Sequence, residues 1–195
     1  MAIKVVLCGP PHSGKSCLRE GLKQAIRRIP GAPYPYVITG CPDGEGAWFQ
    51  ETALRDPELA RECKEAYKAK FTPEFVARVE ESVRNCALPL TIVDVGGRTS
   101  AENKRICSPA THAVILAGDM SLVAEWQSFC EELSLTVVAV IESAYNATED
   151  VVEGIGPDGV LRGSVHHLER GEDNSEREMV VALACRLVEL APREA

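Results

Sequence analysis

The strongest constraint on this chain is a stretch of eight residues near its beginning, GPPHSGKS at positions 9–16. It fits the pattern G-x-x-x-x-G-K-[ST], follows the apolar run at 3–8 and precedes a helix-like segment at 17–26. In this context the pattern indicates a phosphate-binding loop, in which backbone N–H groups and a helix N-terminus surround nucleotide phosphates. The alternative is a glycine-bearing strand–helix turn that binds nothing. The residues expected to contact the nucleotide are Gly9, Pro10, Pro11, His12, Ser13, Gly14, Lys15, Ser16 and Cys17.

Two side chains of this loop have expected roles in chemistry. Lys15 is expected to neutralise charge on the β- and γ-phosphates. The hydroxyl of Ser16 is expected to complete the coordination shell of a magnesium ion. The loop therefore predicts binding of a nucleoside triphosphate together with Mg²⁺.

A second motif follows the apolar run at 88–95, which contains Asp94 and leads into Gly96 and Gly97. A strand that is apolar on both faces belongs in the centre of a parallel sheet. An acidic residue at the tip of such a strand orders magnesium or its waters in nucleotide-binding folds, and we expect this of Asp94. The alternative is a core strand that happens to end in an aspartate at a turn.

The remaining pattern alternates between strands and helices. Strand-like segments lie at 3–8, 34–39, 88–95, 113–117, 135–141 and 160–168, and the stretch 146–159 shows no clear element. Helices are expected after Thr72 and Ser121, which have the residue types of N-caps, at 100–107, and from Met179 to Leu190 as the closing helix. The pattern predicts a single α/β domain over 1–195, a three-layer α/β/α sandwich with a largely parallel sheet of five or six strands. A helical insertion is expected at about 50–87.

The loop CPDGEGAW at 41–48 follows the second strand. Because ligands of open α/β sheets lie beyond the carboxyl ends of the strands, its carboxylates are candidates for binding or deprotonating an acceptor. Asp43 and Glu45 are therefore candidate catalytic residues beside Lys15 and Asp94, and Trp48 is a candidate platform for an acceptor ring. The alternative is ordinary turn chemistry, since Pro-Asp-Gly is a common turn sequence.

Other positive and polar side chains have weaker expected roles. Arg98 and Arg105 are proposed to approach the phosphates. Tyr145 and Asn146 follow the fifth expected strand, where many nucleotide-binding folds contact the base, although a surface turn explains them equally well. The adjacent His166 and His167 point to opposite faces of a strand, and the sequence shows no third ligand nearby, which favours a structural or exposed role over metal binding.

Bulk properties exclude several classes of function. A net charge of −8 and a pI near 5.1 argue against nonspecific binding to nucleic acid or to an anionic membrane. The eight cysteines are scattered, without a C-x-x-C pair, as expected for reduced, buried thiols in a cytoplasmic protein. No apolar stretch reaches the ~18 residues of a membrane span.

The nucleotide is expected to be ATP. A Ras-like GTPase needs a guanine-binding Asn-Lys-x-Asp loop after its fifth strand, and residues 142–146 do not provide one. GTP stays open. Two active arrangements fit: a hydrolase that positions water, and a small-molecule kinase that orients an acceptor hydroxyl. A non-catalytic module that uses nucleotide to regulate a partner is the alternative to both.

The loop at 9–16 together with Asp94 resembles the P-loop NTPase superfamily. A narrower resemblance rests on CGPPHSGKS at 8–16, CPDGEGAW at 41–48, FTPEFV at 71–76 and LPLTIVDVGG at 88–97. These segments are similar to the AAA-type or kinase-like ATPase module that accompanies a CRISPR-associated ring nuclease in some type III systems. The resemblance implies a link to cyclic oligoadenylate signalling in antiviral defence, with the nuclease as a partner in trans or by fusion. Whether the chain forms a homo-oligomer is left open.

Overall fold

The computed structural model describes residues 2–41 and 71–192. The loop that carries Asp43, Glu45 and Trp48, and most of the helical insertion expected at about 50–87, lie outside the described residues.

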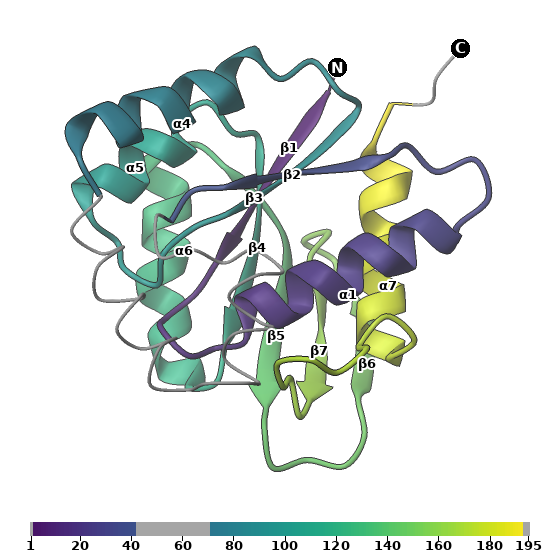
Figure 1. Ribbon diagram of the computed structural model, residues 1–195. Coiled ribbons are helices and arrows are strands. Elements are labelled where there is room, and N and C mark those ends of the chain that lie inside the picture. The colour runs from purple at the N-terminus through teal and green to yellow at the C-terminus, as the bar shows by residue number, and fades with distance from the viewer. Residues whose placement is uncertain (1, 42–70, 193–195) are drawn as a thin grey trace.

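Seven strands of the described chain form one sheet in the order β2-β3-β1-β4-β5-β7-β6 (Figure 1). All neighbouring strands are parallel except β6 and β7, which are antiparallel. The largely parallel sheet confirms the predicted fold class, with one strand more than the upper expectation. The strands are β1 Ile3–Cys8, β2 Pro35–Thr39, β3 Leu90–Asp94, β4 His112–Ala117, β5 Thr136–Ala144, β6 Val151–Ile155 and β7 Leu161–His166.

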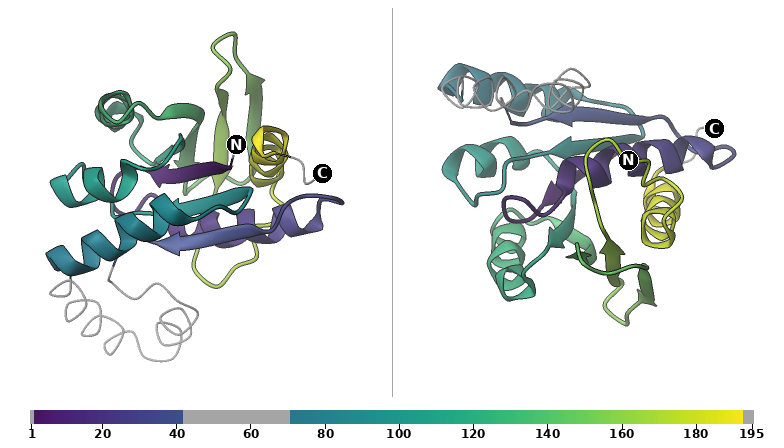
Figure 2. Two further views of the ribbon diagram at one scale, coloured as in Figure 1. Left: turned by 90° about the horizontal axis from the view of Figure 1, so that it is seen from above. Right: turned by 60° about the horizontal axis from the view of Figure 1, so that its bottom comes forward.

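Helices cover both faces of the sheet (Figure 1, Figure 2). The first and last described helices, α1 and α7, pack side by side on one face, and α4, α5 and α6 cover the other. Each face has its own apolar core, which completes the predicted three-layer arrangement. The helices are α1 Lys15–Arg28, α4 Pro73–Asn85, α5 Ala101–Cys107, α6 Val123–Glu132 and α7 Glu178–Leu190, with the 3-10 helix η1 Met120–Leu122 before α6.

The central strands carry the apolar runs recognised in the sequence. Every residue of β3 is buried, and β1 and β4 are buried almost throughout. Because these strands have neighbours on both edges and helices on both faces, only continuous apolar sequence suits them. Their carboxyl ends meet along one edge of the sheet, where the phosphate loop and Asp94 lie together.

Local side-chain chemistry starts the helices. The Thr72 hydroxyl accepts a hydrogen bond from the Phe75 N–H at 3.3 Å, so the predicted cap of α4 is confirmed. Before α6 the expectation was wrong. Asp119, and not Ser121, caps the turn: its carboxylate accepts from both the N–H and the hydroxyl of Ser121, at 3.0 and 2.7 Å. An aspartate two residues upstream is the stronger local acceptor for that N–H.

Strand β6 lies in the stretch expected to have no element. It is an edge strand, with Val151, Val152 and Ile155 exposed and a register irregularity between Val152 and Gly154. A strand with one neighbour and no buried face gives no alternating pattern, which explains why the sequence did not indicate it. None of the helices in the described ranges is both long and apolar enough to cross a membrane.

Candidate functional site

The phosphate loop forms one wall of a cavity of about 880 Å³ at the carboxyl edge of the sheet. Residues of the loop line it together with the end of β3, the start of α5 and the segment that follows β7. Of the residues expected to contact nucleotide, those from Pro11 to Cys17 line the cavity, as does Asp94. Gly9 and Pro10 lie behind them and contribute backbone carbonyls instead.

Glycine is required at two points of close backbone contact. Gly9 has φ +139°, and a Cβ there would lie 1.8 Å from the carbonyl oxygen of Leu116. A Cβ on Gly97 would lie 2.3 Å from the nitrogen of Pro11. The phosphate loop therefore packs directly against β4 at Gly9 and against the turn after β3 at Gly97, and a side chain at either glycine would push the two backbones apart at that point.

The ammonium group of Lys15 is held inside the loop. It is buried and donates hydrogen bonds to the carbonyl oxygens of Gly9 and Pro10, at 2.9 and 2.8 Å. The Ser13 hydroxyl donates to the same Pro10 oxygen at 3.0 Å. The positive charge is thus already positioned over the loop, where phosphate oxygens are stronger acceptors than backbone carbonyls.

Ser16, Asp94 and Arg19 meet at the base of the cavity. Asp94 Oδ2 accepts from the Ser16 hydroxyl at 3.3 Å and from the Arg19 guanidinium at 2.9 Å. Arg19 and Asp94 are each 3% exposed. The ion pair is therefore buried, and removing one partner would leave an uncompensated charge.

This donor set fits a magnesium ion. A serine hydroxyl and an aspartate carboxylate, brought together at 3.3 Å, are the hard oxygen ligands that Mg²⁺ prefers. Arg19 is an addition that sequence reasoning missed, and it offsets part of the negative charge of Asp94. The available signal was its place one helical turn after Lys15, on the same face of α1.

The two candidate arginines separate in the structure. Arg98 lines the cavity. Arg105 does not: its Nε donates to Glu80 of α4 at 2.5 Å, on the outer surface. Its proposed approach to the phosphates is therefore not supported. Arg170, from the segment after β7, lines the cavity instead, and sequence reasoning did not single it out.

Glu102, at the start of α5, adds a carboxylate to the cavity wall. Two hydrogen bonds lower the pKa of this carboxyl below its ordinary value. The larger effect comes from the side chain of Ser100, and the smaller one from the backbone N–H of Glu102 itself. It is therefore ionised at neutral pH. Asp43 and Glu45, the carboxylates predicted to act here, lie outside the described residues.

A second cavity of about 450 Å³ opens beside the first. Its wall is formed by residues 142–147 at the end of β5, and it shares His12, Gly14 and Leu168 with the first cavity. The structure thus brings the predicted base-side residues Tyr145 and Asn146 next to the phosphate loop. Tyr145 is 51% exposed, and its ring packs against the imidazole of His167 with 4.7 Å between centroids.

The cysteines and histidines mostly have structural surroundings. Cys8, Cys107 and Cys130 are buried, and no disulfide joins any of the cysteines in the described ranges. The neighbouring Cys130 thiol and burial raise the pKa of Cys8 well above its ordinary value, so it stays a neutral thiol. His166 contacts the buried Asp150 at 2.5 Å, in agreement with its expected structural role.

Comparisons with known proteins identify the fold and nothing narrower. No protein-family model and no curated protein sequence matches the chain. Among solved structures, it is similar to a plasmid partition protein from Borrelia burgdorferi B31 bound to AMPPNP, with TM-score 0.59, 8% identity and 97% of each chain covered. It is also similar to the septum site-determining protein MinD from Pyrococcus horikoshii OT3 complexed with Mg-ADP, with TM-score 0.59 and 11% identity over 93% of this chain and 95% of that one. The chain therefore has the fold of the P-loop NTPases.

Proposed function

We propose that the protein is a magnesium-dependent, ATP-binding P-loop enzyme that hydrolyses ATP or transfers its γ-phosphoryl group. The observation that carries the proposal is the convergence of Lys15, Ser16 and Asp94 at one end of the 880 Å³ cavity. Both similar structures contain an adenine nucleotide or its analogue, which supports the same ligand here.

Each residue has a specific part in the proposal. The backbone N–H groups at the start of α1 bind phosphate oxygens, and Lys15 exchanges its bonds with the carbonyls of Gly9 and Pro10 for bonds with the β- and γ-phosphates. Ser16 and Asp94 hold the metal. When bound, Mg²⁺ neutralises charge that develops between the β- and γ-phosphates. Arg98 and Arg170 on the cavity wall attract the triphosphate.

The base is proposed to lie in the second cavity. Glu142, Tyr145 and Asn146 surround it, and the sequence there lacks the Asn-Lys-x-Asp pattern that binds guanine. The wall of His12, Gly14 and Leu168 that both cavities share supports a single nucleotide whose base lies in one cavity and whose phosphates lie in the other. The missing guanine pattern favours ATP over GTP.

An acceptor or water has space beyond the phosphate loop. The first cavity extends to Cys41, Phe71 and Glu102, and its volume lies within the range of about 300–1,000 Å³ typical of small-molecule sites. The ionised Glu102 can accept a hydrogen bond from, and so orient, a hydroxyl or water there. Asp43 and Glu45 remain predicted acceptor-side carboxylates.

A second function, regulation of a partner by bound nucleotide without turnover, is favoured by one observation. The guanidinium of Arg19 lies 2.9 Å from the same Asp94 oxygen that faces Ser16. A permanent positive charge at that oxygen weakens the attraction for a divalent cation, and with it metal-assisted chemistry.

Incubation with Mg-ATP separates the two functions. The enzyme releases phosphate or yields a phosphorylated acceptor, and Lys15→Ala abolishes this product while Lys23→Ala, a lysine on the same helix outside the cavity, does not. Tight binding of ATP with no product over hours favours the regulator. Turnover that is unchanged in Lys15→Ala contradicts the proposed site.

Association with a ring nuclease rests on the sequence resemblance alone, because none of the comparisons supports it. It is tested separately from turnover, by mixing the chain with a purified ring nuclease and measuring co-elution with and without ATP. Separate elution under both conditions would contradict association with the nuclease. It would not affect the proposal that the protein binds and turns over ATP.

A further inference from the structure

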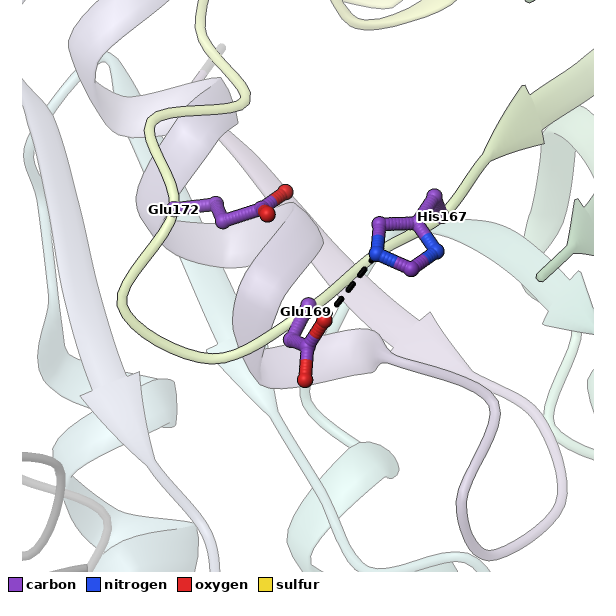
Figure 3. A group of neighbouring side chains, drawn as sticks. All are labelled: His167, Glu169 and Glu172. Atoms are coloured by element: carbon purple, nitrogen blue, oxygen red, sulfur yellow. Dashed lines mark ion pairs between the residues drawn. The ribbon is translucent and has the colours of Figure 1, made fainter. Parts of the chain in front are cut away.

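We propose that His167, Glu169 and Glu172 form a binding site for a divalent transition-metal ion, separate from the site at Ser16 and Asp94. The three residues lie in the segment between β7 and α7, which we call the β7–α7 loop (residues 167–177). Figure 3 shows the three side chains close together, with Glu169 paired with the His167 ring. One potential ligand atom from each lies within 4.8 Å of the other two.

The separations suit a single ion. Two ligand atoms that are each about 2.1 Å from one metal ion lie at most about 4.2 Å apart. Glu169 and Glu172 are exposed, so small rotations of their side chains close the remaining gap. His167 is the partly buried member and is the fixed point of the group.

The orientation of His167 is the observation that points to a cation. Its Nδ1 lies 3.2 Å from the carbonyl oxygen of Tyr145, which can only accept, so Nδ1 carries the proton. Its Nε2 faces a carboxylate oxygen of Glu169 at 3.0 Å. This nitrogen and this oxygen are close enough to bind one metal ion together. A backbone carbonyl that holds Nδ1–H is the usual outer partner of a metal-binding histidine.

Neighbouring groups hold the other ligands in place. The Tyr145 ring packs on the His167 imidazole at 4.7 Å and limits its rotation. Arg177, 12% exposed on its side chain, binds Glu172 Oε2 at 3.1 Å and so orients that carboxylate from outside the cluster. The group brings two carboxylates together beside the imidazole, so their negative charge attracts a divalent cation.

The donor set selects the class of metal. One imidazole nitrogen and two carboxylate oxygens suit Zn²⁺, Co²⁺, Ni²⁺ or Mn²⁺, whereas Mg²⁺ and Ca²⁺ prefer oxygen ligands alone. Three protein ligands on an exposed loop leave coordination positions for water. The loop also carries Leu168 and Arg170, which line the nucleotide cavity, so an ion here would fix a wall of that cavity.

The test is direct metal binding, without nucleotide. Untagged, chelator-treated full chain is titrated with Co²⁺ and with Zn²⁺ in excess Mg²⁺, which saturates oxygen-only sites, and binding is followed by calorimetry and by Co²⁺ absorption. The wild type is expected to bind one equivalent. His167→Asn and Glu169→Gln should each weaken binding at least about tenfold. Asparagine is chosen because it tolerates the positive φ of 39° at this position.

A matched control sits on the same loop. Glu176→Gln removes an exposed carboxylate, paired with Arg28, that is not part of the cluster, and it should leave metal binding unchanged. Binding of wild-type strength in both His167→Asn and Glu169→Gln would place the metal elsewhere, for example on thiols, and overturn the proposal. So would the absence of binding by the wild type up to millimolar Co²⁺. Neither result bears on ATP turnover, so the two proposals fail independently.

Discussion

Two loops meet at the 880 Å³ cavity and are built in different ways. The phosphate loop (residues 9–16) is fixed through its backbone: Gly9 fits against the Leu116 carbonyl, and Lys15 bonds with the loop's own carbonyls. The β7–α7 loop is fixed through side-chain pairs, such as His167 with Glu169 and Arg177 with Glu172. Backbone geometry binds phosphate whatever the rest of the ligand, whereas exchangeable side chains suit selectivity and regulation.

The two loops touch at Leu168. A Cβ placed on Gly14 would lie 2.9 Å from Leu168, which is 6% exposed and lines both cavities. The phosphate loop therefore forms a surface against which the β7–α7 loop packs. If the two loops differ in this way, substitutions in the phosphate loop and in the residues packed beneath it should lower the free energy of unfolding. Substitutions in the β7–α7 loop should change ligand affinity and leave the free energy of unfolding almost unchanged.

The largest loss of stability is expected from breaking the Arg19–Asp94 ion pair, which lies beneath the phosphate loop. Arg19→Met removes the guanidinium that is paired with the buried carboxylate of Asp94 and should lower the free energy of unfolding by about 3–5 kcal/mol in urea titrations. Adding Asp94→Asn also removes the buried negative charge, so the double variant should lose less than the sum of the two single variants. If Arg19→Met lowered the free energy of unfolding by less than about 1 kcal/mol, the Arg19–Asp94 ion pair would not stabilise the fold.

Glycine in the phosphate loop comes next. Gly9→Ala forces a Cβ against the Leu116 carbonyl at a positive φ and should cost about 2–4 kcal/mol by thermal or urea unfolding. Gly31→Ala is the control: it has φ +74° and nothing within 4 Å, so only the backbone cost of about 1 kcal/mol remains. Equal losses in the two variants would show that close backbone contact at Gly9 does not matter.

The smallest effect belongs to the β7–α7 loop. Arg170→Ala removes a positive charge from the cavity wall and should weaken Mg-ATP binding about threefold at low salt, with unfolding unchanged. Arg105→Ala removes an equal charge that is paired with Glu80 on the outer surface, and it should leave affinity within experimental error. If Arg105→Ala weakened binding as much as Arg170→Ala, the effect would reflect net charge and not the cavity.

The same contrast explains what the sequence could predict. The strand–loop–helix unit that carries residues 9–16 and the Thr72 cap depend on residues that are neighbours in the chain, and the structure has both. The nucleotide and metal roles of the loop and of Asp94 stay predictions. Strand β6 was missed because an exposed edge strand has no buried face to set a pattern.

Site residues from distant segments escaped sequence reasoning for a related reason. Glu102 and Arg170 reach the cavity only because α5 and the β7–α7 loop both begin at the same edge of the sheet, which no local pattern encodes. The carboxylates near His167 follow it at two and five residues, yet only the fold of the loop brings all three side chains close together.

The most direct test of the account is equilibrium binding of Mg-ATP and Mg-GTP to the wild type and to Lys15→Ala, measured by calorimetry. The account predicts that the wild type binds ATP more tightly than GTP, and that Lys15→Ala keeps its fold but binds ATP at least about tenfold more weakly, since charge-assisted bonds to phosphate are lost. Lys23→Ala should match the wild type. Equal affinity of the wild type and Lys15→Ala for ATP, or no binding by either, would contradict the claim that this loop holds a nucleotide.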